Sequence, residues 1–203
     1  MTPEDSITPF GSILKDALNP DAPAVNNAYT QAAVLLPFIT RNDMRHLIFT
    51  RRTMTVATHK GQISFPGGMM ELQDLSLKDT ALREAHEEIG LPAQNVEIVG
   101  YLDGMQTITD FWITPVVGVV KTPFQYALAE AEVAEIFEIP LDALMAKSAW
   151  EFGEREYNGA VYRDCRFPWK GHTIWGATGK LTWSLMTRLT THMVESQRTV
   201  EHR

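Results

Sequence analysis

One segment, residues 77–89, constrains the fold most, because it combines an apolar stripe with an acidic cluster on a single predicted helix. The apolar residues recur at helical spacing and share one face; they are Leu77, Ala81, Leu82, Ala85 and Ile89. Gly90 follows directly and favours a helix end at this point. A helix with such a stripe buries it against another layer of secondary structure.

The opposite face of the same helix carries Glu84, Glu87 and Glu88, which meet because residues three and four apart are neighbours on a helix. Like charges at this spacing destabilise a helix by roughly 0.2–0.5 kcal/mol per pair. One interpretation is a solvated acidic surface in which Arg83 pairs with Asp79. The other is a site for a hard cation such as Mg²⁺, whose preferred ligands are oxygen atoms.

A Pro-Gly-Gly turn at residues 66–68 favours the cation site. Proline stiffens the entry to the turn, because its ring fixes one backbone angle. The two glycines let the backbone approach a ligand closely.

The rest of the chain alternates predicted strands with predicted helices. Apolar or alternating runs predict strands at 32–39, 45–52, 96–102, 111–120 and 132–140, with a turn at 40–43 and a loop at 53–67. Further helices are predicted at 12–18, 141–145 and 181–193. This order predicts an α/β (α+β) fold, in which a mixed central sheet lies between helices.

The predicted organisation has three parts. An N-terminal helix and extended arm occupy 1–30, a single domain occupies 31–195, and a polar tail occupies 196–203. The 203 residues contain no repeat or linker and suffice for one hydrophobic core.

Composition excludes several kinds of partner. The formal net charge of −7 argues against binding to nucleic acid or to an anionic membrane, and the apolar runs are too short to span a bilayer. Cys165 is the single cysteine, which predicts a reducing, cytoplasmic setting.

An acidic protein needs a metal or a local basic cluster to hold an anionic ligand. Arg51, Arg52, His59 and Lys60 supply such a cluster beside the turn. The sequence leaves a homodimer open.

The stretch GG-x14-REAHEEIGL, residues 67–91, resembles the Nudix box, whose usual form is G-x5-E-x7-R-E-U-x-E-E-x-G-U with U aliphatic. Its second half matches at Arg83, Glu84, Ala85, Glu87, Glu88, Gly90 and Leu91. Its first half is one residue longer than usual, and Asp74 best represents the isolated acid of the family. The resemblance implies a Nudix-type α/β/α sandwich and a metal-dependent hydrolase of diphosphate bonds.

The preceding stretch, IFTRRTMTVATHKGQISFPGG at 48–68, resembles the signature L-L-T-x-R-[SA]-x3-R-x3-G-x3-F-P-G-G of coenzyme A diphosphatases. Arg52, Gly61 and Phe65 fit, whereas Ala57 stands where that subfamily has arginine. The resemblance implies cleavage of coenzyme A or acyl-CoA to adenosine 3′,5′-bisphosphate and 4′-phosphopantetheine or its acyl form. One alternative is another nucleoside diphosphate derivative such as ADP-ribose. The other is a ligand-binding Nudix module without catalysis.

The resemblance also implies roles for individual residues. The catalytic residues are Glu84, Arg83 and Glu88, and the substrate-binding residues are Arg52, Gly67 and Gly68. Mg²⁺ or Mn²⁺ is expected to bind Glu84, Glu87, Glu88 and the Gly68 carbonyl. The general base is Glu84, with an acid on a later loop as the alternative: Glu130, Glu132 or Glu135.

Overall fold

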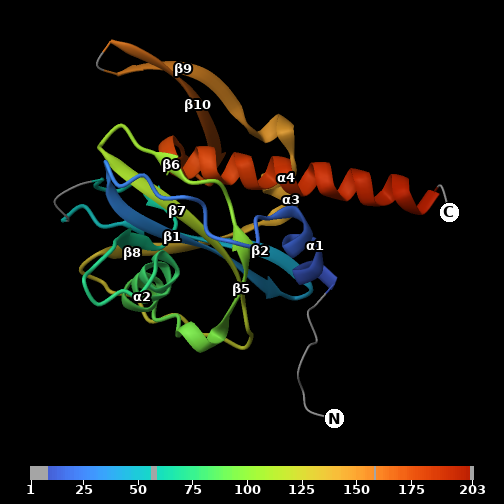
Figure 1. Cartoon of the computed structure of the whole chain (residues 1–203), viewed down its shortest axis with the longest axis horizontal. Coiled ribbons are helices and arrows are strands. Elements are labelled where there is room, and N and C mark those ends of the chain that lie inside the picture. Colours follow the sequence, from blue (N-terminus) through green and yellow to red (C-terminus); the bar gives the residue numbers. More distant parts are fainter. Residues whose placement is uncertain (1–8, 56–58, 158, 202–203) are drawn as a thin grey trace.

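The computed structural model describes residues 9–55, 59–157 and 159–201, and its centre is one twisted sheet with helices on both faces (Figure 1). The helices are α1 (Pro9–Ala17), α2 (Leu77–Ile89), η1 (Ala93–Asn95), α3 (Leu141–Met145), η2 (Lys147–Ala149) and α4 (Gly176–Glu201). The strands are β1 (Thr30–Arg41), β2 (Met44–Arg52), β3 (Ile63–Ser64), β4 (Gly67–Met69), β5 (Val96–Tyr101), β6 (Met105–Gln106), β7 (Phe111–Val120), β8 (Val133–Pro140), β9 (Glu151–Tyr157), β10 (Ala160–Trp169) and β11 (His172–Ile174).

The central sheet has eight strands in the order β3-β2-β1-β7-β5, with β4 paired to β1, β6 to β7 and β8 to β2. β1 runs parallel to β7 and antiparallel to β2. The predicted mixed sheet between helices is therefore confirmed. The predicted turn at 40–43 is confirmed as well, since Asn42 and Asp43 both have positive φ between β1 and β2, as a two-residue hairpin turn requires.

Alternate residues of the strands build two cores, because neighbouring side chains point to opposite faces of a sheet. Ala33, Leu35 and Ile48 pack against the apolar stripe of α2. On the other face, Leu36 and Phe38 belong to the core cluster that includes residues of α1, α3 and α4. The acidic side of α2 is therefore not part of either hydrophobic core.

Residues 63–69 connect β2 to β1 in the part of the sheet where these two strands are no longer paired with each other. Ile63–Ser64 pair with β2, the Leu35 N–H donates to the Pro66 carbonyl at 2.8 Å, and Gly67–Met69 pair with β1. The prediction of a loop over all of 53–67 is thus wrong for 63–64 and Gly67. These strands are too short and too rich in glycine to show an alternating pattern.

Helix α2 begins and ends as its sequence predicts, over residues 77–89. Ser76 caps the N-terminus, since its side chain accepts from the Asp79 N–H, and Gly90 adopts the left-handed conformation with φ of 70°. Glycine is favoured there because it lacks the Cβ that crowds this conformation. Both ends of the acidic helix are fixed by local chemistry.

The C-terminal third departs from the prediction. A hairpin of β9 and β10 was not predicted, because most of its described side chains are exposed, only Asp164 and Phe167 are buried, and apolar residues do not alternate with polar ones along it. α4 begins at Gly176, five residues before the predicted start, and continues through residues 196–201. Among the described residues, no helix is long and apolar enough to span a membrane.

Candidate active site

Three glutamates of α2 lie at graded depth beside β4. The Glu88 side chain is 5% exposed, that of Glu84 is 17% exposed and that of Glu87 is 56% exposed. A buried carboxylate is costly unless charges or hydrogen bonds compensate it. The contacts of these side chains therefore indicate what the cluster binds.

Two adjacent glycines of β4 make room for different neighbours. A Cβ on Gly68 would lie 2.4 Å from Glu84 Oε1, so the Glu84 carboxylate rests directly against the Gly68 backbone. A Cβ on Gly67 would instead lie 2.4 Å from the carbonyl oxygen of Ala33 in β1. Gly68 thus makes room for the acidic cluster, while Gly67 makes room for the neighbouring strand.

Arg83 connects the glutamates to one another and to β4. Its Nη1 donates to Glu84 Oε1 at 2.9 Å and to Glu87 Oε2 at 3.0 Å. Its Nη2 donates to the Met69 carbonyl oxygen at 3.0 Å. The guanidinium therefore fixes the two carboxylates relative to the Gly-Gly segment.

Asp74 in turn fixes Arg83. Its two carboxylate oxygens accept from Arg83 Nε and Nη2, both at 3.0 Å, and Thr80 Oγ1 donates to it at 2.9 Å. The hydrogen bonds from Arg83 lower the pKa of Asp74 to about 2, against the opposing effect of burial. Sequence reasoning did not identify Thr80. Its position six residues after Asp74, in the first turn of α2, was the available signal.

The alternative that Arg83 pairs with Asp79 is wrong. The Asp79 carboxylate accepts from Ser76 Oγ at 2.8 Å, within the N-terminal cap of α2. Arg83 instead uses the acid from the preceding loop, because the loop 70–76 folds back along the helix. Arg83 therefore pairs with an acid outside α2, Asp74, as well as with Glu87 one turn along the helix.

Arg52, at the end of β2, faces the deepest glutamate. Its Nη1 lies 3.7 Å from Glu88 Oε1. Among the described residues, neither Arg52 Nε nor Glu88 Oε2 has a hydrogen-bond partner, and both atoms are buried. Two unsatisfied atoms on opposite charges mark a place where a polar ligand can lie, because such atoms cost free energy until they are paired.

Electrostatics of the cluster oppose ionisation in the absence of a cation. Burial, followed by repulsion from Glu84 and Glu132, raises the pKa of Glu88 to about 8, although Arg52 opposes the shift. Burial also raises the pKa of Glu84, with smaller contributions from Glu87 and Glu132 and opposition from Arg83. A divalent cation would remove this penalty.

The three acids proposed for the later loop lie in different places. Glu132 precedes β8, and its charge acts on both Glu84 and Glu88. Glu135 accepts from Arg51 Nε and Nη2 at 3.2 and 3.1 Å. Glu130 is exposed. Glu132 is therefore the member of this group that the structure brings to the cluster.

The predicted basic cluster does not assemble as a unit. Arg51 and Arg52 point to opposite faces of the sheet, as alternation requires. His59 pairs with the Gln62 side chain at 3.0 Å, and Lys60 is exposed. Ala57 lies outside the described residues. Arg52 is the cation from this stretch that reaches the carboxylates.

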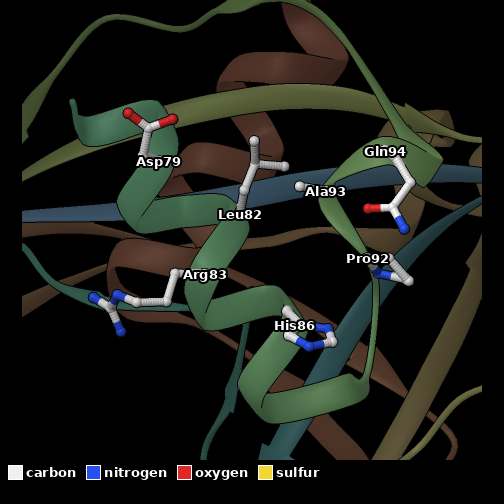
Figure 2. A pocket seen from close by; sticks show the side chains of 7 residues that line it. All are labelled: Asp79, Leu82, Arg83, His86, Pro92, Ala93 and Gln94. Carbon is white, nitrogen blue, oxygen red and sulfur yellow. The ribbon is translucent and has the colours of Figure 1, made fainter. Parts of the chain in front are cut away.

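A shallow hollow of about 540 Å³ lies on the outer side of α2, where the helix faces η1 (Figure 2). Leu82 and His86 line one wall, and Pro92 and Ala93 line the other. The Arg83 guanidinium points away from η1 in this view. None of the three glutamates lines this hollow, and Arg83, which does line it, lies between the hollow and the carboxylate cluster.

The donor set of the cluster fits a hard divalent cation. It offers carboxylate oxygens, a backbone cradle at Gly68 that a Cβ would fill, and the unpartnered Glu88 Oε2. Within the described part of the chain, no three acidic, histidine or cysteine side chains already form a metal-binding arrangement. Arg83 holds Glu84 and Glu87, so these side chains have to turn when an ion binds.

Comparison with known proteins agrees with this site. The NUDIX domain matches residues 29–157. An uncharacterized Nudix hydrolase named NudL from Enterobacter sp. (strain 638) is 38% identical over 148 residues, which are 73% of this chain and 77% of that protein. A protein of the same name from Photorhabdus laumondii is 34% identical and covers 87% of this chain and 94% of its own length.

A solved structure shares the fold. The MutT/nudix family protein from Enterococcus faecalis superimposes with a TM-score of 0.51 at 12% sequence identity, over 93% of this chain and 71% of that one. The match to the NUDIX domain and to relatives named Nudix hydrolase supports a hydrolase that acts on pyrophosphate bonds. The chain belongs to the Nudix family.

Alanine substitution at Gly67 and at Gly68 should have different effects, one mainly on stability and the other mainly on hydrolysis. Gly68→Ala places a methyl group against the Glu84 carboxylate, so we expect at least a tenfold loss of hydrolysis with little loss of stability. Gly67→Ala places it against the β1 backbone, so we expect a loss of about 1–3 kcal/mol in the free energy of unfolding. Urea titration and a chromatographic assay of the two phosphomonoester products of diphosphate cleavage check both, and equal effects in the two variants would contradict this assignment.

Proposed function

We propose that this Nudix hydrolase is a metal-dependent diphosphatase that cleaves coenzyme A or acyl-CoA to adenosine 3′,5′-bisphosphate and 4′-phosphopantetheine or its acyl form. The observation that carries the proposal is the path of residues 48–55 and 59–68. In these described parts, the stretch that resembles the coenzyme A diphosphatase signature runs through β2, β3 and the start of β4 and borders the carboxylate cluster. It places Arg52 3.7 Å from Glu88 and Gly68 against Glu84.

The proposed site divides the work among its side chains. Glu84, Glu87, Glu88 and the Gly68 carbonyl would hold Mg²⁺ or Mn²⁺. When bound, the ion neutralises diphosphate charge and acidifies water. Arg83, anchored by Asp74, positions Glu84 and Glu87 and does not contact substrate.

Substrate binding and proton transfer fall to the remaining groups. Arg52, with its unpartnered Nε, donates to a diphosphate oxygen, and Gly67 and Gly68 let that diphosphate approach the backbone. We assign the general base to Glu84, which is the acid closest to the Gly68 backbone. Glu132 is the alternative base, because its charge reaches both buried glutamates.

A substrate panel tests the proposal. With Mg²⁺ or Mn²⁺, coenzyme A and an acyl-CoA are expected to give the highest kcat/KM, and mass spectrometry should identify adenosine 3′,5′-bisphosphate as a product. Ala57, which replaces the signature arginine, is the feature that favours the second candidate, ADP-ribose or a related nucleoside diphosphate. Turnover of ADP-ribose a hundredfold above that of coenzyme A would replace the first proposal with the second.

The proposed metal site predicts a pH-dependent stabilisation by Mg²⁺. The pKa of Glu88, about 8 in the folded protein, lies above the ordinary glutamate value of 4.5. The contribution of Glu88 to the stability of the metal-free protein is therefore complete below pH 4.5 and is lost as the pH rises through 8. We expect saturating Mg²⁺ to raise Tm by at least about 4 °C more at pH 9 than at pH 6, because 1 kcal/mol shifts Tm by roughly 2–4 °C. Differential scanning fluorimetry measures this, and an equal shift at both pH values would argue against metal binding at Glu88.

A further inference from the structure

The segment 127–133 fastens the end of α2 to the end of β2. Ala127 N–H donates to the Ile89 carbonyl at 3.1 Å, and Ala129 N–H donates to the Glu88 carbonyl at 3.0 Å. Carbonyls in the last turn of a helix have no partner within the helix, so these two bonds satisfy groups that α2 cannot satisfy itself. The segment therefore has a fixed position relative to Glu88.

Gly90 allows this close contact between the segment and the helix. It has φ of 70°, and a Cβ at this position would lie 2.7 Å from the Cβ of Ala127. A side chain at residue 90 would thus push the segment away from α2. The glycine that ends the helix also makes room for the chain between β7 and β8.

Thr53, directly after β2, holds the other end of the segment. Its N–H donates to the Glu132 carbonyl at 2.8 Å, and its Oγ1 donates to the Ala131 carbonyl at 3.0 Å. Thr55 Oγ1 lies 2.9 Å from Thr53 Oγ1 and can donate to it, which leaves the Thr53 hydroxyl proton for Ala131. Thr53 therefore binds two consecutive carbonyls, and a side chain without a hydroxyl keeps only the first of these contacts.

A β-bulge decides which residue lies opposite Thr53. The strands β2 and β8 are in regular register up to Arg51, where one residue of β8 is extra. Regular pairing would bring Val133 opposite Thr53, whereas the bulge brings Glu132 there. Bulges change which side chain a strand presents, and they are frequent next to active sites.

The Glu132 side chain depends on this backbone support. It is exposed, and among the described residues no hydrogen bond or ion pair holds its carboxylate. Its charge nevertheless contributes to the raised pKa values of Glu84 and Glu88, so the carboxylate lies near both. Because the side chain has no such contacts of its own, the backbone at Ala131 and Glu132 decides where the carboxylate lies.

We propose that Thr53 is a positioning residue for diphosphate hydrolysis, because it holds the Glu132 backbone so that the Glu132 carboxylate faces the water that attacks the diphosphate. The inference rests on the proposed function, in which that diphosphate lies at the glutamates of α2. A carboxylate at this place can accept a hydrogen bond from the water and orient it together with Glu84. Thr53 touches neither the substrate nor the water, and its effect on the reaction passes through Glu132.

A double-mutant cycle tests this coupling. Thr53→Val removes the hydroxyl and keeps the N–H, so we expect kcat/KM to fall about threefold to tenfold, the equivalent of one hydrogen bond. Thr53→Ser keeps the hydroxyl and should stay within about twofold of the unaltered protein. In a Glu132→Ala background, Thr53→Val should change kcat/KM by less than about 1.5-fold, because residues that act as a unit are not additive. Thr173→Val, at an exposed position of β11, is the matched control and should change nothing.

Hydrogen exchange of the metal-free full chain gives a readout that does not depend on catalysis. Thr53→Val should speed amide exchange within residues 127–133 about threefold to tenfold and should leave Tm within about 1 °C, because the change is local. Thr173→Val should leave exchange in this segment unaltered. Unaltered exchange in Thr53→Val would overturn the proposal, since the hydroxyl would then not hold the segment.

The outcomes separate this inference from the proposed function, because the cycle is measured with whichever substrate of the panel is hydrolysed fastest. Coupling between Thr53 and Glu132 in a protein that hydrolyses ADP-ribose and not coenzyme A would support the positioning role and overturn the coenzyme A proposal. Hydrolysis of coenzyme A with additive effects of the two substitutions would overturn the positioning role and leave the diphosphatase proposal in place. Full activity of Glu132→Ala would overturn the positioning role as well.

Discussion

Glu88→Gln is expected to lower kcat/KM by on the order of 10²–10³ or more, the range observed when one preorganised charge-stabilising group is removed. The side chain is 5% exposed and, among the described residues, its Oε2 accepts no hydrogen bond, so this oxygen is available to a ligand. In the metal-free protein the same substitution should raise Tm at pH 9, because it removes a buried charge whose pKa is about 8. Steady-state kinetics and thermal unfolding measure the two effects.

A fall in kcat/KM together with a rise in the Tm of the metal-free protein distinguishes a metal ligand from a structural residue. Glu154→Gln, at an exposed position of β9, is the matched control and should change neither activity nor Tm. A Glu88→Gln protein that loses activity because it unfolds would argue against the metal role. A variant that keeps normal activity would exclude it.

Asp74→Asn should destabilise the protein by about 3–5 kcal/mol, as expected when one partner of a buried ion pair is removed. Arg83 would lose its two-point contact and would no longer hold Glu84 and Glu87, so activity should fall as well. Since the folded pKa of Asp74 is about 2, the stabilisation is complete above pH 4 and is lost as the pH falls through 2. Urea unfolding at pH 7 and at pH 3 measures this dependence.

Asp79→Asn is the control on the same helix. Asp79 accepts from the cap residue Ser76 and makes no hydrogen bond to Arg83 among the described contacts, so we expect a loss below about 1 kcal/mol. Equal losses in the two variants would show that Asp74 has no special role in holding Arg83.

Local chemistry made α2 predictable. The apolar stripe, the Ser76 cap and the left-handed Gly90 all act within the helix or next to it, so the sequence predicts its limits and the shared face of Glu84, Glu87 and Glu88. The mixed sheet was predictable for the same reason, because most of its strands carry apolar alternation or long apolar runs.

The contacts between distant segments were not predictable in this way. The ion pair between Arg83 and Asp74 forms because the loop 70–76 folds back along α2. Glu132 lies near the glutamate cluster, whereas Glu135 pairs with Arg51, and this difference depends on which faces of β2 and β8 these side chains occupy. The β9–β10 hairpin escaped prediction because most of its described side chains are exposed, with Asp164 and Phe167 as the buried exceptions, and they carry no periodic signal. Tertiary packing decides these features, and no short sequence window records it.

Anomalous scattering from manganese would test the metal role of α2 most directly. In crystals of the full chain soaked with Mn²⁺ and a non-hydrolysable diphosphate, we expect an anomalous peak at the carboxylates of Glu84 and Glu88 and the carbonyl of Gly68. A bound diphosphate with no manganese peak at these oxygens would contradict the metal-dependent mechanism.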